Sequence, residues 1–290
     1  MLWFLLAFAT AFFSASEVAV AKRTLGDLPP LYIVAYPCAY SLPLFALGLV
    51  FVDIPPIAPG FWSLLAVLVP INALGMLLTY AAVRMSPLSL TMPFQAFTPI
   101  FAVVTGFFFL DEVPSWLGVA GIVTIVFGSW VLTAGGPRRE NDLLAPLKAI
   151  VADPGSRLML GAAIVFAFAV VMGKDLLLHS SPLFAGMSFF IIHNTAILVA
   201  LFLTRTIRPA TLLERPVAGL LIGCVLFVHI VCHNLALSLT YAAYMVAVKR
   251  LNGLISVLYG GVMFKESNMR RRLVGAGLMA LGAAIVALVG

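Results

Sequence analysis

Hydrophobic residues along this chain fall into long runs that are interrupted by short polar connections. A helix needs about 20 apolar residues to cross a bilayer. Ten runs approach that length, and they cover residues 2–21, 31–52, 61–83, 88–110, 115–134, 158–178, 183–204, 216–239, 242–264 and 271–289. Turn-forming pairs such as Pro29–Pro30 and Ser86–Pro87 lie between them. The pattern therefore predicts an all-α membrane protein with ten transmembrane helices.

The composition supports this interpretation. The chain is 63% hydrophobic and only 10% charged, whereas a soluble domain carries about 25% charged residues. The excess of apolar residues is too large for a globular core of this size. The net charge of +6 does not indicate nucleic-acid binding, because the basic residues are spread over the connections. The three cysteines lie inside apolar runs, with no spacing typical of a zinc site or a disulfide.

The runs divide into two groups of five on either side of a polar stretch. A shift of 154 residues aligns four pairs along the two halves: Gly106 with Gly260, Glu112 with Glu266, Gly121 with Gly275, and Gly128 with Gly282. A shift of 152 aligns Lys22 with Lys174 and Pro30 with Pro182. Because five is odd, two such units must cross the membrane in opposite orientations, as the inverted repeats of transporters do. We predict a first five-helix repeat over 1–134, a polar linker over 135–157 and a second repeat over 158–290.

The basic residues are distributed unequally between the two sides of the predicted membrane. Connections on one side carry nearly all the Lys and Arg, whereas the opposite side carries only Lys174. The positive-inside rule therefore predicts that both ends of the chain lie outside the cytoplasm. The first run has no basic segment before it, which favours a membrane span over a cleaved signal.

Ionisable residues inside a membrane are costly and are candidates for function. Lys249 and Arg250 are the eighth and ninth residues of the run 242–264, close to its middle. Neighbouring helix positions point about 100° apart, so we expect Lys249 to face a central cavity and Arg250 to lie at a contact between helices. The alternative is that both are structural. Glu17 is the carboxylate well inside a run, and it is a candidate either to pair with a base or to carry a coupling proton.

The interior is therefore expected to be electropositive and to suit an anionic or zwitterionic solute. Further candidates for contact with a solute are the polar residues within the runs: Asn72, Tyr80, Gln95, His193, His233, Tyr244 and Asn252. Gln95 matches Lys249 in the repeat. The alternatives are hydrogen bonds within the bundle for the histidines and an interfacial position for the tyrosines. Pro93 and Pro99 break backbone hydrogen bonds in the fourth run, which predicts a gate or, alternatively, a static kink.

The arrangement resembles the drug/metabolite transporter superfamily, and in particular its EamA-type members. The resemblance rests on the two five-run halves, on Lys22 and Lys174 with their following prolines, and on the loop residues Glu112 and Glu266 with the glycines that follow. It implies a bundle around a central cavity and secondary transport or export of small metabolites by alternating access. Many members of this superfamily are described with both ends in the cytoplasm, whereas the charge count here indicates the reverse.

We expect a secondary transporter in the bacterial inner membrane, not an enzyme, with a small-molecule substrate and membrane lipid as partners and without nucleic acid or a cofactor. No Gly-rich phosphate loop is present that would use ATP. The sequence is compatible with a homodimer and does not identify the coupling ion. One alternative is a flippase for a lipid-linked anionic headgroup. Another is an intramembrane enzyme using His229 and His233, whose spacing of four residues can also bind a metal.

Overall fold

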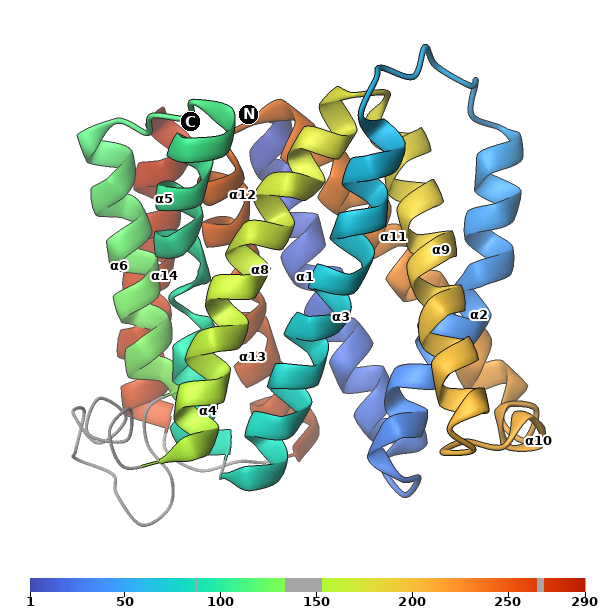
Figure 1. Cartoon of the computed structure of the whole chain (residues 1–290). Coiled ribbons are helices and arrows are strands. Elements are labelled where there is room, and N and C mark those ends of the chain that lie inside the picture. The colour runs from blue at the N-terminus through green and yellow to red at the C-terminus, as the bar shows by residue number, and fades with distance from the viewer. Residues whose placement is uncertain (87, 134–152, 265–268, 290) are drawn as a thin grey trace.

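A computed structural model describes residues 1–86, 88–133, 153–264 and 269–289, and the elements it describes are all α-helices. The helices are α1 (Leu2–Leu25), α2 (Pro30–Val50), α3 (Phe61–Met85), α4 (Leu88–Gln95), α5 (Thr98–Leu110), α6 (Trp116–Thr133), α8 (Pro154–Leu178), α9 (Pro182–Leu203), α10 (Pro209–Leu212), α11 (Pro216–Leu239), α12 (Ala242–Lys249), α13 (Asn252–Phe264) and α14 (Met269–Val289) (Figure 1). The prediction of an all-helical membrane protein is confirmed.

Most predicted runs correspond to one helix each, but the runs 88–110 and 242–264 are each divided into two. Seven segments within the described residues are long and apolar enough to span a bilayer: α1, α2, α3, the residues 91–110, α8, α9 and α11. Two shorter apolar helical segments, Trp116–Leu132 and Val274–Val289, lie in α6 and α14. The number of ten spans stays a prediction.

Helix α8 begins earlier than the predicted apolar run 158–178. Residues 134–152 of the expected linker and its surroundings, and Glu266 of the repeat, lie outside the described residues. The helix α8 starts at Pro154, so the last residues of the predicted linker are helical. Asp153 caps this helix, since its carboxylate accepts a hydrogen bond from the Ser156 N–H at 2.7 Å. Pro154 suits the first helical position because its missing N–H would have no partner there.

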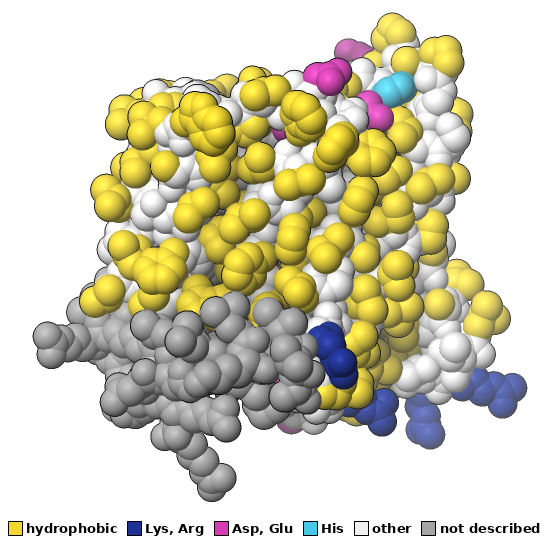
Figure 2. Space-filling model, turned by 60° about the vertical axis from the view of Figure 1, so that its left-hand side comes forward, with side chains coloured by type: hydrophobic (Ala, Val, Ile, Leu, Met, Phe, Trp, Pro, Cys, Tyr) yellow, Lys and Arg dark blue, Asp and Glu magenta, His cyan; other side chains and the backbone are white. Residues whose placement is uncertain are grey.

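The surface shows how the bundle sits in a membrane. Large apolar side chains such as Trp62, Phe108 and Leu203 are exposed, and Figure 2 shows apolar side chains over the lateral face with Lys and Arg gathered at the lower end. We call that end the basic end, and it carries the exposed residues Lys22, Arg23, Arg84, Arg157, Arg205 and Arg208. At the opposite end, here the terminal end, α1 begins and α14 ends (Figure 1). Such a belt between two polar ends is typical of an integral membrane protein.

The two halves pack according to a two-fold relation. In the antiparallel pair α6 and α14, a Cβ added to Gly121 would lie 3.0 Å from the Gly282 carbonyl oxygen, and one added to Gly128 would lie 2.8 Å from that of Gly275. Gly121 corresponds to Gly275 in the repeat, and Gly128 corresponds to Gly282. Gly121 therefore contacts the repeat equivalent of Gly128, and Gly128 contacts the repeat equivalent of Gly121. A two-fold axis between the repeats requires this exchange. The small residues allow the two backbones to approach closely.

The remaining contacts between the halves follow the same relation. The first helix of each repeat packs on the third helix of the other, so that α1 contacts α11 and α8 contacts α3. The second helices, α2 and α9, contact each other. The divided helices lie beside the first helix of the opposite repeat, with α5 next to α8 and both α12 and α13 next to α1. This packing brings the two helix breaks into the interior of the bundle.

Candidate functional site

The first helix break separates α4 from α5 at Ala96 and Phe97. The Ala96 N–H donates to the Pro93 carbonyl at 3.2 Å, a tighter turn than an α-helix makes. Pro99 lies in the first turn of α5, where its missing N–H is not needed. The Thr98 hydroxyl caps the broken end by donating to the Gln95 carbonyl at 2.8 Å. The interruption falls between the two prolines that the sequence singled out, and their role as a gate stays a prediction.

The second break separates α12 from α13 at Arg250 and Leu251. The Leu251 N–H donates to the Val248 carbonyl at 3.0 Å, and the Gly253 N–H donates to the Arg250 carbonyl at 3.0 Å. No proline occurs here, and the sequence prediction of one continuous helix over 242–264 was wrong. The repeat shift places Lys249 on Gln95 and Asn252 on Thr98. The two breaks therefore occur at equivalent positions of the two repeats.

A cavity of ≈ 370 Å³ lies between the breaks, within the range of about 300–1,000 Å³ that small-molecule sites occupy. Its polar lining residues are Ser14, Asn72, Gln95, Thr98, His233, Asn234, Lys249, Arg250 and Asn252, and its aromatic ones are Phe166, Phe189 and Phe190. The lining part of α8 runs from Phe166 to Leu177, which is the half nearer the terminal end. The cavity thus extends from the level of the breaks toward the terminal end.

The charge of the cavity wall is positive. Both Lys249 and Arg250 line it, and the lining residues include no Asp or Glu. The Nε atom of Arg250 is buried and has no hydrogen-bond partner among the described groups. The expectation that Arg250 lies away from the cavity was incorrect, because α12 ends at Lys249 and helical spacing does not continue into the break. A buried guanidinium N–H without a partner is costly, and two cations in a wall without a carboxylate favour an anionic group in the cavity.

The structure brings together five of the predicted solute-contacting residues in this wall: Asn72, Gln95, His233, Lys249 and Asn252. The Asn252 side chain donates to the Ser14 hydroxyl at 3.4 Å, which joins α13 to α1. The Asn72 side chain donates to the Leu68 carbonyl of its own helix at 3.3 Å. Both amides keep further donor or acceptor capacity toward the cavity.

Three other predicted residues do not line this cavity. Tyr80 is 38% exposed on the outside of the bundle. Tyr244 is buried, and its hydroxyl accepts a hydrogen bond from the Ser115 N–H at 3.3 Å. His193 stacks on Phe189 and is hydrogen-bonded to Asn194 at 3.2 Å. Their positions do not support contact with a solute in this cavity.

Glu17 pairs with a histidine. Its Oε2 atom lies 3.2 Å from Nδ1 of His229, whose ring centroid is 6.4 Å from that of His233. Pairing with a base is one of the two roles expected for this carboxylate, and the base that the structure places beside it is a histidine. Within the described residues, no group of three His, Cys, Asp or Glu side chains could hold a metal ion.

Glu112 and Lys174 form a buried ion pair that the sequence pattern did not predict. Lys174 donates to Glu112 and, at 2.7 Å, to the Thr240 carbonyl. Glu112 also accepts the Ala242 N–H at 2.8 Å, so it caps α12. The sequence identified both residues as landmarks of the repeat, and Lys174 as the lone basic residue of its side. The pair joins the two repeats in the half of the bundle nearer the terminal end, and Lys174 lies on α8 between the cavity-lining residues Gly173 and Leu176.

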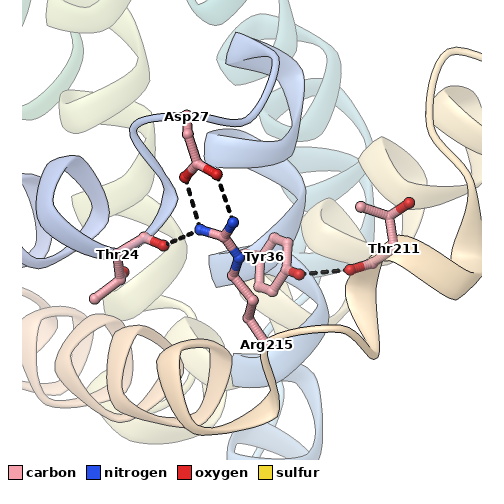
Figure 3. A network of polar contacts seen from close by, with 5 residues as sticks. All are labelled: Thr24, Asp27, Tyr36, Thr211 and Arg215. Atoms are coloured by element: carbon pink, nitrogen blue, oxygen red, sulfur yellow. Dashed lines mark hydrogen bonds and ion pairs between the residues drawn. The ribbon is translucent and has the colours of Figure 1, made fainter.

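A second ion pair joins the repeats at the basic end, as Figure 3 shows. Arg215 donates to both carboxylate oxygens of Asp27, at 2.7 and 2.5 Å, and to the Thr24 carbonyl at 2.5 Å. Nearby, the Tyr36 hydroxyl donates to the Thr211 carbonyl at 2.5 Å. The hydrogen bonds from Arg215 hold the pKa of Asp27 below its ordinary value. The guanidinium fixes the connection between α1 and α2 against the start of α11.

Two repeats that enclose a polar cavity between broken helices define a helical membrane protein of the transporter class. The model of the EamA-like transporter family matches residues 1–134 and 154–288, and the chain belongs to this family. A crystal structure of a protein with 15% sequence identity superposes with a TM-score of 0.75 over 99% of this chain and 96% of that chain, which shows the same fold. No curated protein matches the sequence.

Proposed function

We propose that this protein is a secondary transporter for a small anionic or zwitterionic metabolite in the bacterial inner membrane. Ten spans, arranged as two inverted five-helix repeats over 1–134 and 158–290, would alternate access to the central cavity. The observation that carries the proposal is the wall with two cations and no carboxylate at the level of both helix breaks. The solute and the surrounding lipid are the partners that this proposal requires.

Each part of the cavity has a separate role in this proposal. Lys249 and Arg250 bind the anionic group of the solute, because it relieves their mutual repulsion. Gln95 at the first break and Asn252 at the second break donate hydrogen bonds to its polar atoms. The N-termini of α5 and α13 add partial positive charge at the breaks, as broken helices do in other transporters. Phenylalanines of α8 and α9, such as Phe189, contact its apolar part.

The symmetry of the bundle supplies the movement. Since the halves have the same fold in opposite orientations, exchanging their conformations moves the opening of the cavity from one face to the other. The Glu112–Lys174 pair fastens the terminal end, and the Asp27–Arg215 pair fastens the basic end. Alternation requires each pair to weaken in turn.

A thermal-shift screen of purified protein tests the choice of solute. Anionic, zwitterionic and cationic metabolites of similar size are compared in wild type, Lys249→Ala and the exposed control Arg84→Ala. We expect an anion or zwitterion to stabilise wild type and the control, with affinity reduced roughly ten- to hundredfold in Lys249→Ala, the loss typical of one charged hydrogen bond. Stabilisation by cations alone, or equal affinity in Lys249→Ala, would contradict the proposal.

A further inference from the structure

The Glu17–His229 pair lies just beyond the cavity, on the side of the basic end. Helix α1 runs from the terminal end toward the basic end, and Ser14 lines the cavity one turn before Glu17. Helix α11 runs the opposite way, and His233 lines the cavity one turn after His229. Glu17 is therefore one helical turn nearer the basic end than Ser14, and His229 is one turn nearer that end than His233 and directly precedes Ile230, which also lines the cavity.

The polar atoms of this pair continue toward the cavity. Glu17 Oε2 and His229 Nδ1 are 3.2 Å apart, and the side chains are 21% and 9% exposed. The other ring nitrogen of His229, Nε2, and the Nδ1 atom of His233 are both buried without a hydrogen-bond partner among the described groups. Buried imidazole nitrogens are normally hydrogen-bonded. Two unpartnered ones between a carboxylate and a polar cavity indicate a place where a proton can be taken up and released.

Titratable groups on three of the helices that pack against α1 or α11 lie around the pair. On α12, the charge of Lys249 acts on both histidines and on Glu17, and Arg250 is its neighbour. On α2, Cys38 is close enough to respond to the charge of Glu17. On α13, the Tyr259 hydroxyl lies 2.8 Å from that of Ser16, next to Glu17 in the chain. The groups named around Glu17 are thus basic or neutral, and none of them is a second carboxylate.

We infer that Glu17 and His229 form a proton-binding site beside the cavity. With the carboxylate ionised and the ring neutral, the pair carries one negative charge. A proton taken from water onto the imidazole makes the pair neutral, and its release to water restores the negative charge.

The position of the site gives this charge change a consequence, which rests on the proposed function. A neutral pair leaves the positive charges of Lys249 and Arg250 less compensated, so an anion in the cavity binds more tightly. By thermodynamic reciprocity, the bound anion favours the proton equally. Anion and proton therefore bind together and travel in the same direction.

The test follows the charge of His229 in the full chain, without any solute. Protein with ¹⁵N-labelled histidine is placed in nanodiscs and titrated by NMR, and the His229 signal is assigned by its loss in His229→Gln. We expect this signal to titrate between about pH 5 and 8, the range in which histidine changes charge. In Glu17→Gln the midpoint of the His229 titration falls by about one pH unit, because the carboxylate that stabilises the charged ring has been removed. Glu214→Gln, the same change at an exposed site, leaves the His229 curve unchanged.

The inference is overturned if His229 keeps one charge state throughout that range, or if its curve is the same in wild type and Glu17→Gln. Should Glu17→Gln fail to fold, Glu17→Asp withdraws the carboxylate by one methylene and must also move the midpoint. Because no solute is present, a negative result here is independent of the thermal-shift screen, which alone tests the anion preference of the cavity.

Discussion

Glu112 and Lys174 come from different repeats and meet where both are buried, at 5% and 9% exposure. Removing one member of such a pair leaves the other charge without compensation, which costs about 3–5 kcal/mol. We therefore predict that Glu112→Gln lowers the thermal unfolding temperature markedly, and that adding Lys174→Met restores much of the loss. Unfolding followed by intrinsic fluorescence in nanodiscs measures both. A Glu112→Gln variant as stable as wild type would show that the pair does not hold the terminal end.

The pair of Asp27, which is exposed, and Arg215, which is half-buried, makes a different prediction, which concerns pH. Since the hydrogen bonds from Arg215 lower the pKa of Asp27 in the folded protein, the stabilisation is fully present above the unfolded pKa of about 3.9. It is lost as the pH falls through the lower folded pKa. The difference in unfolding temperature between wild type and Asp27→Asn should therefore be constant above about pH 5 and shrink in stronger acid. A difference that grows on acidification would refute this role.

At the residue scale, the sequence predicted how deep in the membrane a polar residue lies along its helix. It did not predict which side of the helix the residue occupies. Lys249, Gln95 and Asn72 were recognised because polar residues near the middle of an apolar run are rare. His193 met the same criterion and yet is packed against Phe189 in the core. The sequence pattern contains no information on which side of a helix faces a cavity when every side is apolar.

The contact between α6 and α14 depends on glycine at the element scale. A Cβ at Gly128 would lie 2.7 Å from the backbone nitrogen of Met279, whereas one at Gly277 would have no atom within 4 Å. We predict that Gly128→Leu forces the two helices apart and destabilises the protein by about 1–3 kcal/mol. Gly277→Leu, the same change on the open side of α14, serves as the matched control. Equal unfolding temperatures for the two variants would contradict the close packing of this pair.

The two helix breaks differed in how far they could be predicted. Pro93 and Pro99 indicated the first break, because each proline removes a backbone donor. The second break has no proline, and its signals, the adjacent charges Lys249 and Arg250 followed by Asn252 and Gly253, are also compatible with a continuous helix. Only the repeat relation to the first break, once the structure had shown it, explains its position.

The two-fold arrangement could be predicted at the scale of the whole molecule. Glycines recur at matching positions of the two repeats because each repeat contributes the same residues to one close helix contact. The pairing of Glu17 with His229 could not, since it joins residues 212 positions apart by packing alone. The identity of the solute depends on the shape of a cavity that many helices build together, and the linear pattern does not encode it.

The distribution of basic residues predicts the orientation of the whole molecule. Exposed Lys and Arg gather at the end opposite to the start of α1 and the end of α14. We predict that the basic end faces the cytoplasm and that a reporter fused after Gly290 is active only outside it. Cytoplasmic activity of that reporter would reverse the assignment and the sidedness of the cavity.

Access to the cavity from both faces is the central claim, and labelling of one residue tests it most directly. In a chain whose three cysteines, Cys38, Cys224 and Cys232, have been replaced, Gln95→Cys places a thiol in the cavity wall and Phe108→Cys, at a 73% exposed lateral site, is the control. A membrane-impermeant maleimide is applied to right-side-out and to inverted vesicles. We expect modification of Gln95→Cys in both preparations and of Phe108→Cys in neither. Modification of Gln95→Cys from a single side, or from none, would contradict alternating access.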